Sequence, residues 1–458
     1  MPSSDTIAAI ATPPGTGAVG IIRISGPAAF KIARQIFRSK KKNESWESHH
    51  LYYGDIISSD GQIILDEVLI TIMFGPHSFT GEDVLEINCH GNSLIMHAIL
   101  SQLLQSGCRL ARPGEFSQRA FLNGRIDLSQ AEALATLITA RSEKAREIGL
   151  ACLKGTLSSE IDNLRNRLVD ILATMEASID FAEDVEDEDA PVILPQIELL
   201  SKQLKKLLDS YETAKIYTNG LNVVIAGKPN VGKSSLLNTM MGKTRAIVTD
   251  IPGTTRDFIE GRIDISGLPV NLTDTAGIRK SDDVIEKAGI DLVWKNLDCA
   301  DLVLILLDGS KPLTKEDAEV FTGISTRNHL VLINKTDLAA AWQINELHQL
   351  SPDSKILKIS AKFGMGIDEL KQAILDKTIR DKTEDTGMIM IANIRQKIAL
   401  EKALNNIEMA KKNILSNQSP ELTAFDLREA LDNLDEITGK KINDEILDKI
   451  FSSFCIGK

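Results

Sequence analysis

The sequence predicts a multidomain protein in which an α+β N-terminal region is followed by helical segments that flank an α/β region. The chain has 458 residues, which is more than a single domain usually contains. Two long stretches carry apolar residues at helical spacing, and another region alternates apolar strands with helical segments. We expect domain boundaries that divide the chain into residues 1–120, 121–217, 218–382 and 383–458.

Composition and charge indicate a soluble globular protein of a reducing compartment. Apolar residues make up 43% and charged residues 25% of the chain, as is usual for globular domains. The net charge of −12 argues against a general nucleic-acid coat protein, although a local basic patch is compatible with it. No signal peptide is recognisable, and no apolar run reaches the roughly 20 residues of a membrane span. We therefore expect a cytoplasmic protein with no membrane partner. The five scattered cysteines form no CxxC pair and fit reduced thiols better than disulfides: Cys89, Cys108, Cys152, Cys299 and Cys455.

Residues 1–120 are predicted to form strands with a few helices, because apolar runs such as "VGIIRIS" and "EVLITIMF" are separated by turn residues. The segment "GTGAVG" (Gly15–Gly20) matches the GxGxxG pattern of dinucleotide-binding loops. That pattern needs a following helix and an acidic residue about 20 positions later. Here the β-type run "IIRIS" follows, and residues 40–42 are lysines. We interpret the segment as a turn between strands.

Helical segments are predicted on both sides of the α/β region. Apolar residues at 4-3-4-3 spacing begin at Leu157 and again at Ile197, which places each set on one helical face. The acidic stretch "EDVEDEDAP" between them fits a solvated loop better than a metal site. Leu427, Leu431 and Leu434 give a further apolar face after Met388. One helical domain interrupted by an insertion and two separate helical domains both fit this pattern.

The region from Leu221 to about Lys382 is predicted to be a parallel α/β sheet, because the strands "LNVVIA", "DLVLILLD" and "HLVLIN" alternate with helical segments. The first strand runs into "GKPNVGKS" (Gly227–Ser234), which fits the phosphate-loop pattern GxxxxGK[ST] and is followed by a helical segment. The glycines allow main-chain N–H groups to surround phosphates. Lys233 is expected to reach the β- and γ-phosphates, and the Ser234 hydroxyl to bind Mg²⁺.

Three shorter motifs specify the nucleotide. "DTAG" (Asp274–Gly277) places a carboxylate where the Mg²⁺ shell needs one, and "NKTD" (Asn334–Asp337) places a carboxylate that can accept two N–H groups of guanine, which adenine cannot match. "SAK" (Ser360–Lys362) is the supporting base loop. Together these motifs predict a GTP-binding domain. The residues expected at GTP are Asn230, Val231, Gly232, Lys233, Ser234, Ser235, Thr249, Asp250, Ile251, Pro252, Gly253, Thr254, Thr255, Asp274, Thr275, Ala276, Gly277, Asn334, Lys335, Thr336, Asp337, Ser360, Ala361 and Lys362.

The predicted hydrolysis machinery is unusual. Ile278 occupies the position after "DTAG" where many GTPases carry a glutamine that orients water. Acidic candidates for handling the water follow at Asp282, Asp283 and Glu286, and the residues alone do not choose among them. No arginine finger is evident. The Asn230 side chain and carbonyls of "TDIPGTTRD" (residues 249–257) can instead hold a monovalent cation, and Thr255 can bind Mg²⁺.

The chain ends in "IFSSFCIGK", where a lipid anchor, a reactive thiol or an inert residue are the three interpretations of Cys455. A prenylation box needs aliphatic residues after the cysteine and a terminal residue unlike lysine. Gly457 and Lys458 do not fit it. The lipid interpretation therefore fails.

The whole chain resembles the MnmE (TrmE) family of tRNA-modification GTPases. The resemblance includes "ATPPGTGAVGIIRISG", "SFTGEDVLE", "ARPGEFSQRAFLNGRIDLSQAEA", "AIVTDIPGTTRD", "DTAGIR" and the terminal "IFSSFCIGK". It implies an N-terminal domain that binds folate and mediates homodimerisation, and a helical domain interrupted by the G domain. The rival interpretations are a ribosome-assembly or signalling GTPase and a helical scaffold with a degenerate G domain.

The resemblance also implies partners and a reaction. With the FAD-dependent partner MnmG (GidA), in a heterotetramer, the family uses a folate one-carbon unit to install an aminomethyl or carboxymethylaminomethyl group. The group is added to C5 of the wobble uridine of certain tRNAs. Hydrolysis of GTP is expected to need Mg²⁺ and K⁺ and to be driven by dimerisation of the G domains.

Particular residues receive roles from the resemblance. Asn230 would bind K⁺, together with the main chain of Thr249, Ile251 and Thr254. Glu286 would be the catalytic glutamate, and Lys233 would be a further catalytic residue. Cys455 would lie near the folate pocket, where we favour a functional thiol over a packing role. The expected ligands of the tetrahydrofolate derivative, in its 5-formyl or methylene form, are Arg23, Glu82, Arg125 and Lys458.

Overall fold

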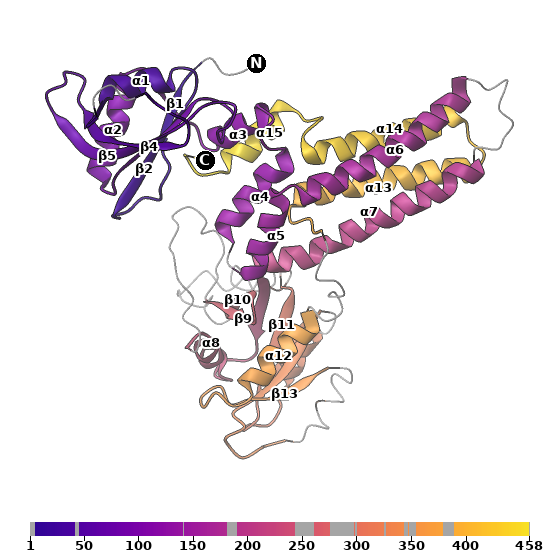
Figure 1. Cartoon of the computed structure of the whole chain (residues 1–458). Coiled ribbons are helices and arrows are strands. Elements are labelled where there is room, and N and C mark those ends of the chain that lie inside the picture. Colours follow the sequence, from indigo (N-terminus) through magenta and orange to yellow (C-terminus); the bar gives the residue numbers. More distant parts are fainter. Residues whose placement is uncertain are drawn as a thin grey trace, which may run out of the picture. The chain divides into compact units, whose positions relative to one another are not determined.

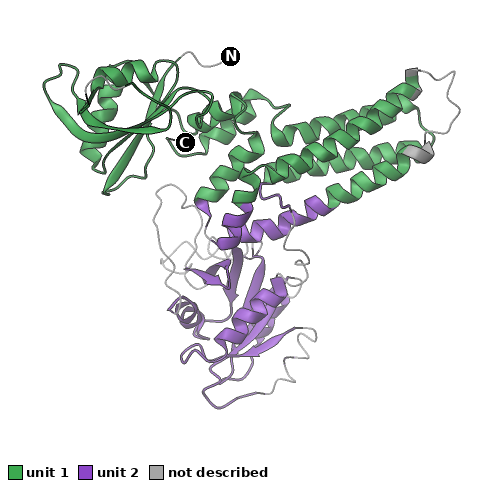
Figure 2. Ribbon diagram, viewed as in Figure 1, with its two compact units in different colours: residues 1–138, 149–205, 394–458 green, residues 139–148, 206–393 purple. Residues whose placement is uncertain are grey.

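The computed structural model describes most of the chain, and its helices and strands are labelled in Figure 1. The described residues are 5–41, 45–140, 142–180, 190–242, 261–274, 297, 300–324, 327–342, 347, 354–378 and 389–457. They form two compact units, which Figure 2 distinguishes by colour. The first unit contains Met1–Ile138, Gly149–Lys205 and Ile394–Lys458, and the second contains Thr139–Ile148 and Lys206–Asn393.

The N-terminal part of the first unit is a seven-stranded sheet with the order β3-β4-β5-β6-β2-β1-β7. Its pairs are antiparallel except for β1 with β7. Strand residues such as Ile22 and Ile70 share one core with Ile32 of α1 and Ile99 of α2. Helices α1 and α2 therefore pack on the apolar side of the sheet. The elements are β1 (Ile7–Ile10), β2 (Val19–Ser25), α1 (Ala29–Ile36), β3 (Phe37–Ser39), β4 (His50–Ile57), β5 (Ile64–Met73), β6 (Val84–His90), α2 (Ser93–Gln105) and β7 (Arg109–Leu110).

The C-terminal end of the chain packs beside the region that follows this sheet. Helix α15 (Asp444–Ser452) contacts α3 (Glu115–Leu122), and its Phe451 shares a core with Leu128 of α4 (Leu128–Thr139). Gly114, which has a φ of 66°, precedes α3, and a Cβ atom there would overlap the Phe451 carbonyl. Glycine is therefore required where the two segments meet.

Long helices form the rest of the first unit. Helix α6 (Thr156–Asp180) packs against α14 (Pro420–Thr438), and α14 packs against α13 (Ile394–Leu415). The predicted apolar face of α6 is buried, as Leu157, Ile161 and Leu164 show. Segments from before and after the α/β region therefore share one helical body. Helices α5 (Glu143–Leu153) and α7 (Ala190–Asn219) each have residues in both units.

The second unit contains a six-stranded sheet with the order β13-β12-β11-β8-β10-β9. Its strands are parallel except for β9, an antiparallel edge strand that the sequence analysis does not foresee. Apolar cores lie on both faces, one shared with α8 and α12 and the other with α10. The elements are β8 (Leu221–Ala226), α8 (Lys233–Gly242), β9 (Gly261–Ile265), β10 (Leu268–Asp274), β11 (Leu302–Asp308), α10 (Lys315–Ile324), β12 (His329–Asn334), β13 (Ile356–Lys358) and α12 (Ile367–Thr378).

Polar residues close the carboxyl ends of these buried strands, where ligands of open α/β sheets bind. Strand β11 is buried along its whole length and ends at Asp308, β10 ends at Asp274, and β12 ends at Asn334. Among the described residues, no helix combines the length and apolar character that a membrane span requires.

Candidate functional site

The phosphate loop connects the end of β8 to the start of α8. Gly227 has a φ of 152° and Gly232 a φ of 104°, values that residues with a side chain rarely adopt. A Cβ atom on Gly232 would overlap the Asn334 side-chain amide, so the loop also lies close to the neighbouring motif. Asn230 adopts a φ of 65°. The loop is thus a tight main-chain structure leading into a helix N-terminus, the geometry that binds phosphate.

Lys233 and Ser234 begin α8 and are held at the loop. Lys233 is buried, and its Nζ donates to the carbonyls of Gly227 and Lys228, both at 2.9 Å. The Ser234 Oγ donates to Asp274 Oδ2 at 2.9 Å, and Asp274 is itself buried. A hydroxyl beside a carboxylate is the oxygen donor set that Mg²⁺ prefers. The pairing of β8 with β10 brings the two groups together.

Asn334 connects the phosphate loop to the base loop. Its Nδ2 donates to the Val231 carbonyl at 2.8 Å, and its Oδ1 accepts from the Ala361 N–H at 2.9 Å. The side chain is buried. Asn334 therefore joins the main chain of the two loops that the sequence analysis expects at GTP.

The remaining base-loop residues surround an exposed carboxylate. Asp337 is exposed, and its Oδ1 accepts from the Ser360 hydroxyl at 2.6 Å, while Ser360 is fully buried. The Thr336 hydroxyl donates to the Ile359 carbonyl at 2.9 Å. Lys362 lies over the Phe363 ring at 5.3 Å from its centroid. A fixed carboxylate at the surface can accept two N–H groups of a base.

Asp308, which the sequence analysis does not include, is connected to the phosphate loop through Lys335. Its Oδ2 accepts from Lys335 Nζ at 2.6 Å, and Lys335 also donates to the Asn230 carbonyl at 2.9 Å. Burial would raise the pKa of the Asp308 carboxyl, but hydrogen bonds from Lys335 and Ser310 outweigh it and hold the pKa below its usual value. Its position at the end of a quoted strand, like that of Asp274, is the signal that could have found it.

A cavity of about 270 Å³ lies beside the phosphate loop. One wall is the loop from Lys228 to Val231, and the other is formed by Asp308, residues 311–313, Glu316 and Asp317. Within it, Lys228 Nζ pairs with Asp317 Oδ2 at 2.5 Å. The Thr314 N–H also donates to Asp317 Oδ2, at 2.9 Å, so the start of α10 is tied to the phosphate loop.

Several predicted site residues lie outside the described residues. They include the proposed catalytic glutamate, the K⁺-binding main chain and part of the Mg²⁺ shell. Among them are also the two other acidic candidates and the residue after "DTAG". They are Thr249, Asp250, Ile251, Pro252, Gly253, Thr254, Thr255, Thr275, Ala276, Gly277, Ile278, Asp282, Asp283, Glu286 and Lys458.

In the first unit, Arg23 of β2 lies beside the C-terminal tail. Its Nη1 donates to the Gly457 carbonyl at 3.3 Å, and its Nε and Nη2 each lie 2.8 Å from Glu86 Oε1. The guanidinium is 5.5 Å from the Phe79 ring centroid and 5.7 Å from that of Phe116. Arg23 is thus a cation close to two aromatic rings.

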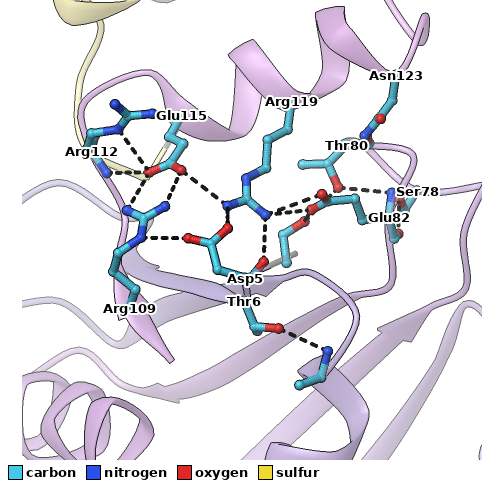
Figure 3. Close-up of polar contacts among 12 residues, drawn as sticks. Asp5, Thr6, Ser78, Thr80, Glu82, Arg109, Arg112, Glu115, Arg119 and Asn123 are labelled. Atoms are coloured by element: carbon cyan, nitrogen blue, oxygen red, sulfur yellow. Dashed lines mark hydrogen bonds and ion pairs between the residues drawn. The ribbon is translucent and has the colours of Figure 1, made fainter. Parts of the chain in front are cut away.

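Glu82 and Arg125 are linked to Arg23 through neighbouring elements. Arg125 Nε donates to the Ser78 carbonyl at 3.0 Å, and the Ser78 hydroxyl donates to the Glu82 carbonyl at 2.6 Å. The Glu82 carboxylate accepts from Arg119, as Figure 3 shows. The loop that carries Ser78 and Glu82 also carries Phe79, one of the rings beside Arg23. Arg119 is absent from the sequence-based list, and only its place inside the quoted "GEFSQRAFLNGR" run hinted at it.

The tail brings Cys455 toward the same region. The Cys455 carbonyl accepts from the Gly114 N–H at 3.3 Å, two residues before the Gly457 carbonyl that Arg23 binds. Of the four described cysteines, Cys455 is exposed and the others are buried. Burial raises the thiol pKa to about 11 at Cys89 and Cys152 and to about 12 at Cys108. Since a thiolate is the reactive form, Cys455 is the described cysteine best suited to chemistry.

Comparisons with known proteins identify the family of the chain. Two family models match the chain: the MnmE helical domain over residues 128–455 and the GTP-binding protein TrmE N-terminus over residues 6–125. A protein of Syntrophus aciditrophicus named tRNA modification GTPase MnmE is 48% identical over 454 residues and is matched over 99% of both chains. Proteins of the same name from Acetivibrio thermocellus and Alkaliphilus oremlandii are 43% and 44% identical, over 100% and 99% of both chains.

Among solved structures, the G domain of the T. maritima FeoB iron transporter matches 34% of this chain and 98% of its own. The identity is 28% and the TM-score 0.27. The two family models and the full-length identities decide the assignment. The chain belongs to the MnmE family of tRNA modification GTPases.

Proposed function

We propose that the protein is a K⁺-stimulated GTPase that modifies C5 of the wobble uridine in certain tRNAs. It would add an aminomethyl or carboxymethylaminomethyl group from a folate one-carbon unit, together with the FAD-dependent partner MnmG. The observation that carries this proposal is membership of the MnmE family along the whole chain. The phosphate loop, the Ser234–Asp274 pair and the Asp337–Ser360 pair support the GTPase part.

The described residues have separable roles at GTP. Lys233 would bind phosphate oxygens in place of the loop carbonyls that it contacts here. Ser234 and Asp274 would hold Mg²⁺, which when bound neutralises phosphate charge. Asp337 would select guanine, while Asn334 and Lys335 would keep the phosphate loop in its left-handed conformation. The main-chain N–H groups at the start of α8 would present the positive end of the helix dipole to the phosphates.

Hydrolysis would depend on residues that lie outside the described part of the chain. Glu286 would act on the attacking water through a further water, and K⁺ at Asn230, Thr249, Ile251 and Thr254 would take the place of an arginine finger. Dimerisation of two G domains would complete the site.

Replacing K⁺ by Na⁺ at constant ionic strength is expected to lower the GTPase rate at least tenfold. An unchanged rate would disprove the K⁺ part alone.

The substitution Glu286→Ala tests the assignment of the glutamate. It should abolish hydrolysis and leave the affinity for a fluorescent GTP analogue within about twofold, because the carboxylate acts on water and not on the nucleotide. Asp283→Asn, three positions earlier, is the matched control and should keep most of the activity. Loss of nucleotide binding in Glu286→Ala would instead indicate a structural role.

The first unit would bind the tetrahydrofolate derivative. Arg23, Arg125 and Lys458 are cations suited to the anionic tail or a formyl oxygen, and Glu82 is an acceptor for ring N–H groups. The aromatic rings of Phe79 and Phe116 beside Arg23 suit a flat ring system. When bound, the folate supplies the one-carbon unit. Calorimetric binding of 5-formyltetrahydrofolate tests the proposal, which fails if the protein does not bind it.

Cys455 would be a catalytic thiol at this site. Its exposure and the contact of the tail with Arg23 support this role. Cys455→Ser should keep GTPase activity and lose wobble-uridine modification, measured by mass spectrometry of tRNA nucleosides. Normal modification would instead indicate that Cys455 has only a packing role.

The proposed assembly is a cytoplasmic homodimer joined by its N-terminal domains, in a heterotetramer with MnmG. The decisive experiment is co-purification with MnmG, followed by a tRNA modification assay with and without GTP and K⁺. Modification that proceeds equally well without GTP would contradict the coupling. Complete lack of modification in the reconstituted complex would contradict the function itself.

A further inference from the structure

Glu82 is surrounded by donors that the sequence analysis does not assign to the folate site. Arg119 Nη1 donates to both carboxylate oxygens at 3.2 Å, and the Ser25 hydroxyl donates to Oε2 at 2.6 Å. Ser25 and Thr80 are fully buried, and Arg119 is 4% exposed. Figure 3 shows how the loop carrying Glu82 and the helix carrying Arg119 face one another. These contacts bring together residues from three separate parts of the first unit.

The hydroxyl groups form a ring of bonds with only one arrangement of hydrogens. The Thr80 Oγ1 accepts from the Glu82 N–H at 3.3 Å and lies 2.7 Å from the Ser25 Oγ. A hydroxyl has one hydrogen to donate, and Ser25 donates its hydrogen to the Glu82 carboxylate. Thr80 must therefore donate to Ser25. The main chain and the carboxylate of Glu82 are joined through these two buried hydroxyls, which holds the side chain in one conformation.

Arg119 is itself fixed from the opposite side. Its Nη2 donates to Asp5 Oδ1 at 2.7 Å and to Glu115 Oε1 at 3.2 Å, and its Nη1 donates to the Asp5 carbonyl at 3.0 Å. Arg109 binds the same two acidic side chains, with Nε 2.7 Å from Asp5 Oδ2 and Nη1 3.0 Å from Glu115 Oε2. Among the described residues, Arg109 makes no hydrogen bond or ion pair with Glu82, so it offers a matched control.

Counting acceptor positions shows what Glu82 can still bind. Each carboxylate oxygen can accept about two hydrogen bonds. Among the described residues, Oε2 accepts from Ser25 and Arg119, whereas Oε1 accepts from Arg119 alone. One acceptor position therefore remains on Oε1. A ligand group that meets it must donate an N–H or O–H, and an anionic tail does not.

We infer that Arg119 and the Ser25–Thr80 pair are positioning residues that hold the Glu82 carboxylate to accept an N–H group of the folate ring system. The inference rests on the proposed folate site. Arg119 and Ser25 would act on the ligand only through Glu82, so their effect depends on an intact carboxylate. A merely structural role would not show that dependence.

A double-mutant cycle tests the inference, with 5-formyltetrahydrofolate as the probe and calorimetry as the measurement. Ser25→Ala and Arg119→Lys should each weaken binding about tenfold, the scale of one hydrogen bond to a charged group. Ser25→Thr should restore the hydroxyl and the affinity. In a Glu82→Gln background, Ser25→Ala should have no further effect. Arg109→Lys should bind like the wild type.

Each contrary result has a distinct meaning. Failure of both the wild type and Arg109→Lys to bind would overturn the folate proposal and this inference with it. Normal binding by Ser25→Ala and Arg119→Lys would overturn the inference alone. The same loss from Ser25→Ala in the Glu82→Gln background would also overturn it, because the serine would then act independently. Thermal unfolding of every variant identifies a general loss of fold.

Discussion

At the scale of single residues, Lys335 contacts the phosphate loop directly. Its Nζ bridges the Asn230 carbonyl and the Asp308 carboxylate. Asn230 and Lys335 both have a positive φ, at 65° and 64°, which costs energy for residues with side chains. Ser310 occupies the other oxygen of Asp308 with its N–H and hydroxyl. Asp308 thus holds the Lys335 ammonium in place, and this ammonium in turn holds the phosphate loop.

Asp308→Asn should weaken GTP binding about tenfold, because an amide replaces one oxygen acceptor of the Lys335 ammonium and adds a donor. Titration with a fluorescent GTP analogue measures the effect. Asp264→Asn is the control, since Asp264 accepts the Gly267 N–H in the β9–β10 turn and makes no hydrogen bond to the described part of any nucleotide motif. Equal affinities in the two variants would show that Lys335 does not need Asp308.

The lowered pKa of Asp308 has a consequence for stability. A carboxyl whose pKa falls on folding stabilises the folded state above its ordinary pKa of about 3.9, and this stability is lost as pH falls through the lowered value. The melting temperature of the wild type should exceed that of Asp308→Asn near neutral pH, and the difference should shrink below about pH 4. Thermal unfolding across this range checks it. A difference that does not change with pH would contradict the assignment.

At the scale of elements, a buried ion pair joins three helices of the first unit. Arg395 Nε and Nη2 contact the two oxygens of Glu132 on α4 at 2.7 and 3.0 Å. Arg395 also donates to the Glu436 and Ile437 carbonyls near the C-terminus of α14, where a cation is favourable. The buried Gln396 amide donates to Glu132 as well. Arg395 begins α13, just where the chain re-enters the helical body.

Arg395→Met should destabilise the helical body by about 3–5 kcal/mol, because it leaves Glu132 buried without its counter-ion. Arg428→Met is the matched control, since Arg428 pairs with Glu176 at the surface of α14 and α6. Surface pairs contribute at most about 1 kcal/mol. Denaturant unfolding followed by circular dichroism measures both. Similar losses in the two variants would contradict the argument.

At the scale of the whole molecule, one face of the N-terminal sheet exposes apolar side chains. Leu51 and Tyr53 of β4 are 62% and 49% exposed, and Leu69, which pairs with Tyr53, is 43% exposed. The opposite face is covered by α1 and α2. An exposed apolar sheet face indicates an interaction surface. It supports the proposed homodimer, in which a second copy would cover this face.

Leu69→Lys should therefore convert a dimer into a monomer, because the charge would be buried in the interface. Light scattering coupled to size exclusion measures the mass at several concentrations. Leu94→Lys, at an 81% exposed position of α2, is the control and should leave the mass unchanged. A monomeric wild type, or a dimeric Leu69→Lys, would contradict this interface.

Sequence alone predicted the elements and motifs whose residues are neighbours in the chain. Periodicity predicted the buried face of α6, and the phosphate loop was recognised because its glycines and Lys233 occupy one short segment. Asp274 and Asn334 were found because each follows a strand of apolar residues. These features depend on local conformation and on one or two apolar faces, which composition and spacing encode directly.

The tertiary structure decided which distant residues meet. Arg119 with Glu82, Lys335 with Asp308 and Arg395 with Glu132 are pairs separated by 37, 27 and 263 positions. Some of these residues can be singled out by motif or strand position, but nothing in the sequence shows which one pairs with which. The packing of helices, strands and loops selects each pair, because a buried charge is tolerated only beside its partner. The sequence thus determined the family, the nucleotide motifs and the order of the helical and α/β regions. Packing decided which residues hold the sites in place.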